Sequence, residues 1–218
     1  MEFGVVFDMD GVLVLSEEAH WESWRQVAAG REVELTREVF LSTFGQVNRD
    51  CIPTMFGSVS EPELERIAEA KERAYREIVR ADLPLAPGLF TRLDELQRAG
   101  ARLAVGSSAP PENIDLVLDV GGLREYFPVS VDGTQVRHGK PAPDVFLLAA
   151  EKLGIAPARC VVIEDAPAGI RAARAAGMRA VGVATTQPED ALLEAGADAV
   201  APDVAALDIS LVMGEGLR

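Results

Sequence analysis

The sequence predicts a doubly wound α/β fold, in which a parallel β-sheet carries an inserted all-helical segment. From about Pro87 onward, short apolar runs alternate with amphipathic helical stretches and glycines, which is typical of βαβ units. An earlier apolar run near the N-terminus supplies the first strand, and the residues between have helical periodicity and charged faces. We therefore expect an α/β core domain over residues 1–14 and 85–218 and a helical domain over residues 15–84.

The first strand is predicted from the run Phe3-Gly4-Val5-Val6-Phe7. This run is β-branched and aromatic with almost no polar alternation, which indicates a strand buried on both faces. In the helical segment, Ser16 followed by Glu17 and Glu18 is typical of a helix start. Glu61–Arg80 predicts a long amphipathic helix, most of whose charges we expect on a solvated face.

The remaining elements follow from the alternation of apolar runs with helix-stop glycines such as Gly100, Gly154 and Gly177. Helices are expected over Leu89–Ala99, from Pro110 onward, over Pro143–Leu153 and Ile170–Ala176, and near Glu189–Glu194. Strands are expected over Arg102–Gly106, Pro128–Val131, Cys160–Ile163 and Ala180–Val183, and near Ala197–Val200.

The composition excludes several classes of protein. The chain has 218 residues, enough for a core, and 48% of them are hydrophobic, which argues against disorder. Its formal net charge of −14 disfavours a nucleic-acid surface, and no run reaches the roughly 18 apolar residues of a membrane span. Met1-Glu2 leads straight into the strand, so we expect no signal peptide. Cys51 and Cys160 form no CxxC pattern, which suits the cytoplasm.

Asp8-Met9-Asp10-Gly11 follows the first strand directly and is the most informative motif. Two carboxylates that leave a buried strand repel each other and are costly to desolvate unless a cation or hydrogen-bond donors compensate. A divalent metal ion together with a catalytic task is the simplest explanation.

Further polar groups fall at the ends of other predicted strands: Ser107, Lys140, and the pair Glu164-Asp165. Each alone is a weak signal, because residues after strands commonly cap the next helix. In a parallel sheet, however, ligands bind at the carboxyl ends of the strands, so these groups are expected to converge with Asp8 and Asp10.

This combination closely resembles the haloacid dehalogenase-like superfamily of phosphohydrolases and phosphomutases, and within it the β-phosphoglucomutase-like branch. The resemblance spans essentially the whole chain and includes the helical insertion, which is similar to that family's cap domain on a Rossmann-like core. It is carried by motifs at Asp8–Val12, Ser107, Lys140–Asp144 and Glu164–Ile170, with His20, Trp24 and Arg49 in support.

The resemblance implies a division of roles between the carboxylates. Asp8 would attack phosphorus and form an aspartyl phosphate, while Asp10 would act as general acid and then general base. Mg²⁺ would be held by Asp8, Asp10 through its backbone carbonyl, and Asp165, with Glu164 supporting this set.

The resemblance also implies how phosphate is held. Ser107, Ser108 and Lys140 would bind the phosphoryl oxygens, and Gly11 would let the backbone turn tightly beside them.

In the cap, the resemblance makes His20 and Arg49 candidates for substrate binding, with a packing histidine and a surface arginine as the alternatives. Lys71 matches a cap lysine of the mutases, but a solvated position on the charged helix is our preferred interpretation. Trp24 is expected to pack in the core or at the cap interface.

The first functional hypothesis is a Mg²⁺-dependent phosphatase acting on a small phosphorylated metabolite, expected to be a sugar phosphate. A β-phosphoglucomutase is the alternative, but mutases carry polar and basic residues where this chain has Ser108-Ala109-Pro110-Pro111. Leu15 is a second departure, because relatives commonly carry an aspartate there. A phospho-receiver module or a non-catalytic binding protein is the minor alternative. We expect a monomer or weak homodimer.

Overall fold

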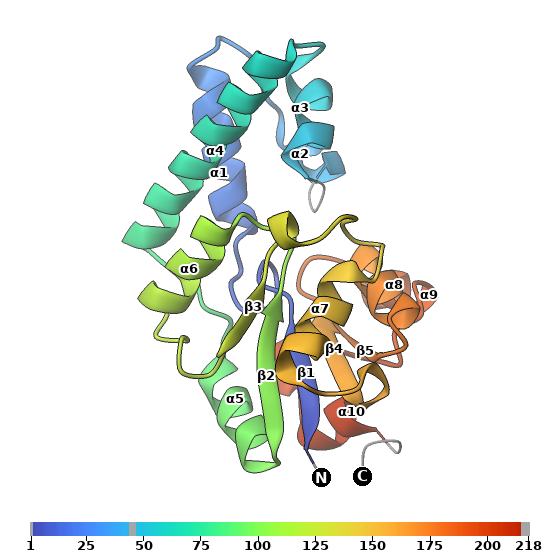
Figure 1. Cartoon of the computed structure of the whole chain (residues 1–218). Helices are drawn as coiled ribbons and strands as arrows, with labels where there is room; N and C mark the ends of the chain where they lie inside the picture. Colours follow the sequence, from blue (N-terminus) through green and yellow to red (C-terminus); the bar gives the residue numbers. More distant parts are fainter. Residues whose placement is uncertain (1, 44–46, 215–218) are drawn as a thin grey trace. The chain divides into compact units, whose positions relative to one another are not determined.

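The structure, a computed structural model, describes residues 2–43 and 47–214. The chain forms two compact units (Figure 1). One, here called the sheet unit, comprises the described parts of residues 1–15 and 85–218, and the other, the helical unit, comprises those of residues 16–84.

The sheet unit is built on six parallel strands in the order β3-β2-β1-β4-β5-β6. The strands are β1 (Phe3–Phe7), β2 (Ala101–Gly106), β3 (Val129–Val131), β4 (Cys160–Glu164), β5 (Arg179–Val183) and β6 (Ala199–Ala201). The chain moves outward from β1 to β3, returns to the centre at β4 and then moves outward on the other side. This is the doubly wound arrangement expected from the sequence, and it places the reversal of strand order between β1 and β4.

Strand β1 is buried along its whole length, as its apolar run predicts. Val6 belongs to a core cluster with residues of β4, α7 (Asp144–Leu153) and α8 (Pro167–Ala175). Its neighbour Phe7 points to the other face, because successive side chains of a strand alternate, and its ring packs edge-on against Phe127 with centroids 5.6 Å apart. Figure 1 shows α7 lying across one face of the sheet.

The last helix of the sheet unit was not expected from the sequence, and the others differ from the expectation only at their ends. The helices are α5 (Leu89–Arg98), α6 (Pro111–Val120), α7, α8, α9 (Glu189–Glu194) and α10 (Ile209–Met213), with 3₁₀ turns η1 (Gly133–Gln135), η2 (Pro157–Arg159) and η3 (Val204–Ala206). Among the expected helices, the largest difference is at α8, which begins three residues before the expected Ile170. Pro167 occupies its first turn, where a missing N–H costs nothing.

The helical unit contains α1 (Glu17–Ala29), α2 (Arg37–Thr43), α3 (Asn48–Phe56) and α4 (Glu61–Ala81). Over residues 16–43 and 47–84 it has no strand, as the sequence suggested. Its core combines apolar side chains from all four helices: Trp24, Phe40, Cys51, Ile52, Met55 and Ile67.

Both cysteines are buried and free, as expected from their spacing. In the described part of the chain, every helix is too short or too polar to span a bilayer.

Candidate active site

The carboxylates singled out in the sequence meet at the centre of the sheet. Asp8 follows β1 directly, Glu164 is the last residue of β4, and Asp165 comes next. Because β1 and β4 are neighbours, these residues share one edge of the sheet at the point where strand order reverses. That point is where open parallel sheets bind their ligands.

Asp8, Glu164 and Asp165 form a buried acidic cluster. Each offers a carboxylate oxygen, and these oxygens lie within 4.8 Å of one another. All three residues are at most 8% exposed. Oxygen atoms at such spacing suit a hard divalent cation, which takes carboxylate ligands readily.

Lys140 supplies a positive charge to this cluster. Its Nζ lies 2.8 Å from Asp8 Oδ1 and 2.7 Å from Glu164 Oε1, and its side chain is 9% exposed. It comes from the loop between η1 and α7, so the ammonium group joins parts of the chain that are far apart in sequence. One ammonium against three carboxylates leaves negative charge at this edge of the sheet.

The second oxygen of Glu164 is held by the backbone. The amides of Asp165 and Ala166 both donate to Glu164 Oε2 at 2.8 Å. Gly169, in the first turn of α8, lies against the same carboxylate so closely that a Cβ there would overlap it. Glu164 is therefore fixed from both sides, as suits a group that supports a metal site.

Gly11 makes the turn after Asp10. Its φ of +76° is in the left-handed region, and its N–H donates to the carbonyl of Val14 at 2.7 Å. A Cβ at this position would overlap the Asp165 carboxylate. Only glycine lets the loop after β1 approach the residue after β4 this closely.

The electrostatics of the cluster favour an added cation. Burial raises the pKa of Asp8 to about 7, the charges of Glu164 and Asp10 act in the same direction, and Lys140 opposes them. Burial, together with the charges of Glu164 and Asp8, also raises the pKa of Asp165 well above its usual range. Burial alone would lower the pKa of Lys140, but Asp8 and Glu164 raise it above its ordinary value. A divalent cation would stabilise the ionised carboxylates.

The residues present thus fit a magnesium ion by the nature of their donors and their charge. Asp10 is half-buried beside this cluster, since its charge acts on Asp8. Its backbone pairs with that of Val14 in the turn closed by Gly11.

Ser107 follows β2, the neighbour of β1 on its other side, and is 2% exposed. Its hydroxyl accepts a hydrogen bond of 3.1 Å from the amide of Ala109, which leaves its O–H available as a donor. Ser108 is exposed. Pro110 and Pro111, at the start of α6, have no N–H groups, so this loop is poor in backbone donors.

In the helical unit, Arg49 forms an ion pair with Glu61 in which both side chains are more than half exposed. The ring of His20 is stacked on that of Tyr75, with centroids 4.3 Å apart. Trp24 lies in the unit's core, as expected.

The expected solvated position of Lys71 is wrong. Lys71 is 3% exposed, its Nζ lies 2.8 Å from Glu72 Oε1, and it packs near the rings of Trp24 and Tyr75. The aliphatic stem of lysine packs well on apolar surface, and the ring faces attract its ammonium group. The charge pattern of a long helix does not reveal such a neighbourhood.

Sequence reasoning missed Thr185 and Thr186, which follow β5. Thr185 Oγ1 donates to the carbonyl of Gly11 at 2.5 Å, and Thr186 Oγ1 donates to Asp165 Oδ2. No local signal distinguishes them, because threonines after a strand are common in turns.

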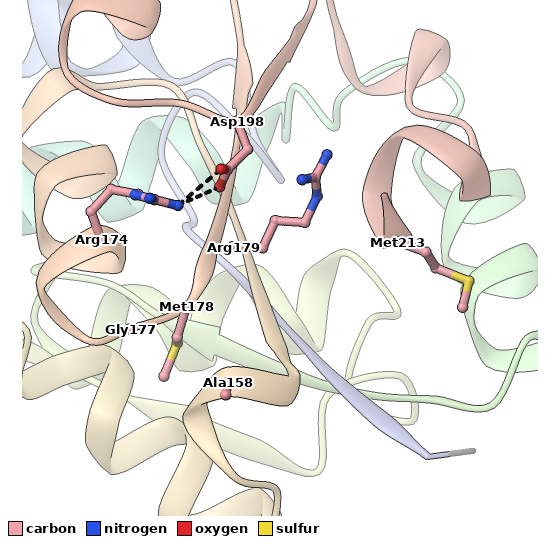
Figure 2. A pocket seen from close by; sticks show the side chains of 7 residues that line it. All are labelled: Ala158, Arg174, Gly177, Met178, Arg179, Asp198 and Met213. Carbon is pink, nitrogen blue, oxygen red and sulfur yellow. Dashed lines mark hydrogen bonds and ion pairs between the residues drawn. The ribbon is translucent and has the colours of Figure 1, made fainter. Parts of the chain in front are cut away.

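A separate hollow lies at the opposite, amino ends of β4, β5 and β6 (Figure 2). In it, Arg174 is bonded to both oxygens of Asp198, at 2.9 and 2.8 Å. Arg179 donates to the carbonyls of Leu211 and Val212, each at 3.1 Å. Both guanidinium groups are thus held by the protein, and the hollow is a strand's length away from the acidic cluster.

A doubly wound sheet with buried carboxylates and a lysine at its switch point is typical of an α/β enzyme whose acidic edge could hold a cation. The chain belongs to the haloacid dehalogenase-like hydrolases, whose family description matches residues 4–177.

Curated relatives and solved structures agree with this family. The chain is 34% identical over 203 residues to a phosphorylated carbohydrates phosphatase of Thermotoga maritima, covering 90% of this chain and 92% of the relative. It is 32% identical over 219 residues to the β-phosphoglucomutase of Bacillus subtilis, covering 97% and 94%. A crystal structure of CbbY from Rhodobacter sphaeroides in complex with phosphate superposes with a TM-score of 0.85 at 28% identity, covering 97% and 99%.

Proposed function

We propose that this protein is a Mg²⁺-dependent phosphatase that hydrolyses a small phosphorylated metabolite, a sugar phosphate in the first instance. The observation that carries the proposal is the meeting of Asp8, Glu164 and Asp165 with Lys140 at the strand-order reversal. At such an edge the carboxylates can bind a divalent cation, and this cation together with the lysine can bind a negatively charged phosphate group.

In the first step, a carboxylate oxygen of Asp8 attacks phosphorus and forms a P–O bond. The bond from phosphorus to the metabolite's oxygen breaks, and Asp10 gives its proton to that leaving oxygen. Lys140, 2.8 Å from Asp8, orients the attacking carboxylate and offsets charge on the phosphoryl oxygens.

In the second step, a water molecule attacks the aspartyl phosphate. Asp10, now ionised, takes a proton from this water, the P–O bond to Asp8 breaks, and inorganic phosphate leaves. Both carboxylates return to their starting states, so atoms and protons balance over the cycle.

Asp8, Asp165 and the backbone carbonyl of Asp10 would hold Mg²⁺, with Glu164 in support. When bound, the ion neutralises phosphoryl charge and fixes the orientation of the group to be transferred. Ser107, through its O–H, and Lys140 would bind the phosphoryl oxygens, with Ser108 and the turn at Gly11 beside them.

The names of the relatives support a phosphorylated carbohydrate as the substrate class. We propose that His20, Arg49 and Lys71 of the helical unit contribute to the choice among such substrates. The net charge of −14 favours a small substrate over a nucleic acid, and the buried free cysteines suit a cytoplasmic location.

The test is a panel of phosphometabolites assayed with MgCl₂ and with a chelator, in which phosphate release and isomer formation are both measured. We expect phosphate release that requires Mg²⁺ and that falls at least about 1,000-fold in Asp8→Asn, because the nucleophile is lost. Equal activity of the parent and Asp8→Asn would refute the assignment of Asp8.

A β-phosphoglucomutase is a second candidate, favoured by the relative of that name. The same panel separates the two activities. A mutase would interconvert β-glucose 1-phosphate and glucose 6-phosphate when primed with a bisphosphate and would release little inorganic phosphate. The donor-poor loop after Ser107, with Pro110 and Pro111, supports the phosphatase.

A further inference from the structure

The loop after β5 makes two hydroxyl contacts to the acidic edge of the sheet. Thr185 donates to the carbonyl of Gly11, in the turn after β1, and Thr186 donates to the Asp165 carboxylate, after β4. These two consecutive threonines therefore connect the carboxyl ends of three strands.

The environment of Thr186 restricts the position of Asp165. A Cβ on Gly11 would overlap the Asp165 carboxylate and lie 3.0 Å from the Thr186 methyl group, so these three residues are in close packing. Asp165 is 4% exposed, so water does not substitute easily for a lost hydrogen bond.

The contact is chemically suited to a carboxylate that also binds a cation. A hydroxyl donates one hydrogen, whereas a carboxylate offers about four acceptor positions on two oxygens. One charge-assisted bond from Thr186 fixes the rotation of the carboxylate and leaves acceptor capacity for a metal ion.

We propose that Thr186 is a positioning residue that sets the affinity of the site for Mg²⁺ by orienting the Asp165 carboxylate. This inference rests on the proposed function. In this role Thr186 acts through Asp165, with which its hydroxyl is in contact, and needs no contact with the substrate. Partners that orient a metal-ligating group typically change metal affinity about 10–100-fold when removed.

The experiment compares Thr186→Val, which keeps the shape and removes the hydroxyl, with Thr186→Ser, which keeps the hydroxyl. The melting temperature of each protein is measured against MgCl₂ concentration without substrate. We expect the Mg²⁺ midpoint of Thr186→Val to rise about 10-fold and that of Thr186→Ser to stay within about 2-fold of the parent. Thr91→Val, an exposed change on α5, is the matched control and should leave the midpoint unchanged.

Kinetics with p-nitrophenyl phosphate provide a second measurement. At saturating Mg²⁺, kcat of Thr186→Val should return to within about 3-fold of the parent, since only cation affinity is altered. An unchanged Mg²⁺ midpoint in folded Thr186→Val, or an equal loss of affinity in Thr186→Ser, would overturn the proposal. If the valine prevents folding, Thr186→Ala gives the same comparison.

The two proposals fail in different ways. If the parent shows a Mg²⁺ midpoint but releases no phosphate from any substrate, the phosphatase assignment is wrong while the role of Thr186 is still measured. If the parent releases phosphate and Thr186→Val binds Mg²⁺ as tightly as the parent, only the role of Thr186 is wrong.

Discussion

The two units place their charged side chains differently. In the sheet unit, Asp8, Lys140, Glu164 and Asp165 come from distant parts of the chain and meet in one buried cluster. In the helical unit, most ion pairs lie at the surface, and in Arg49–Glu61 both side chains are more than half exposed.

The helical unit's exception is Lys71–Glu72, a buried pair of neighbouring residues. Asn48 also donates to Glu72 Oε1, at 2.7 Å. The sheet unit's cluster sets one lysine against three buried carboxylates and therefore carries excess negative charge. The buried pair described in the helical unit sets one lysine against one carboxylate of the next residue.

The two buried lysines give the sharpest test of this contrast. Lys140→Met should lower the free energy of unfolding by about 3–5 kcal/mol at neutral pH without Mg²⁺, because it leaves buried carboxylates without their cation. Lys71→Met should cost less, about 1–3 kcal/mol, because Glu72 keeps its bond from Asn48. Urea denaturation measures both, and equal losses would contradict the distinction between the units.

Alanine substitutions at one glycine of each unit test how tightly the two units are packed at these positions. Gly169→Ala should destabilise the protein by about 1–3 kcal/mol, because its Cβ would overlap the buried Glu164 carboxylate. Gly30→Ala, in the helical unit, meets no atom closer than 3.6 Å and has a φ of −66°, so it should stabilise by about 0.4–1 kcal/mol. Thermal unfolding distinguishes them, and a neutral Gly169→Ala would show that the Glu164 side chain moves freely.

The acidic cluster predicts a pH-dependent response to magnesium. The pKa of Asp8 rises from 3.8 to about 7 on folding, so the folded state keeps a proton that the unfolded state has lost. Without Mg²⁺, this group therefore makes the free energy of unfolding fall as pH rises from about 4 to about 7. Mg²⁺ competes with that proton, so the rise in melting temperature on adding MgCl₂ should be larger at about pH 8 than at about pH 5.5.

Asp8→Asn is the control for this titration, because it removes the group. The variant should lose the part of the pH dependence that Asp8 causes. An equal response to MgCl₂ at both pH values in the parent would exclude Asp8 as the group that competes with the metal.

Arg49 should have the smallest effect on stability. Its pair with Glu61 is exposed to solvent, so Arg49→Ala should leave the melting temperature unchanged. If Arg49 binds substrate as we propose, KM should rise for substrates with a distal anionic group and stay constant for p-nitrophenyl phosphate. If KM is unchanged for all substrates, Arg49 does not bind substrate and is only a surface arginine.

The sequence was most informative where backbone geometry restricts the choice of residue. The alternation of apolar runs with amphipathic helical stretches predicted the fold. Asp8 after one apolar strand and Glu164 and Asp165 after another predicted the edge where the carboxylates meet. Parallel strands bring their carboxyl ends together whatever the loops do.

Side-chain environments created by tertiary packing could not be predicted in the same way. Lys71 looked like any lysine on a charged helix until the rings of Trp24 and Tyr75 were placed beside it. Thr186 gave no signal, because its contact with Asp165 depends on how β5 lies beside β4.

The two points where the chain leaves and re-enters the sheet unit are joined to each other. Val14 bridges Leu85, and the amide of Ala86 donates to the carbonyl of Leu13 at 2.9 Å. A segment whose ends already meet can be lengthened, shortened or exchanged without rethreading the sheet, as inserted domains are. The inserted helices can therefore be replaced during evolution without a change in the strand order of the sheet unit, so the two parts of the chain can evolve independently.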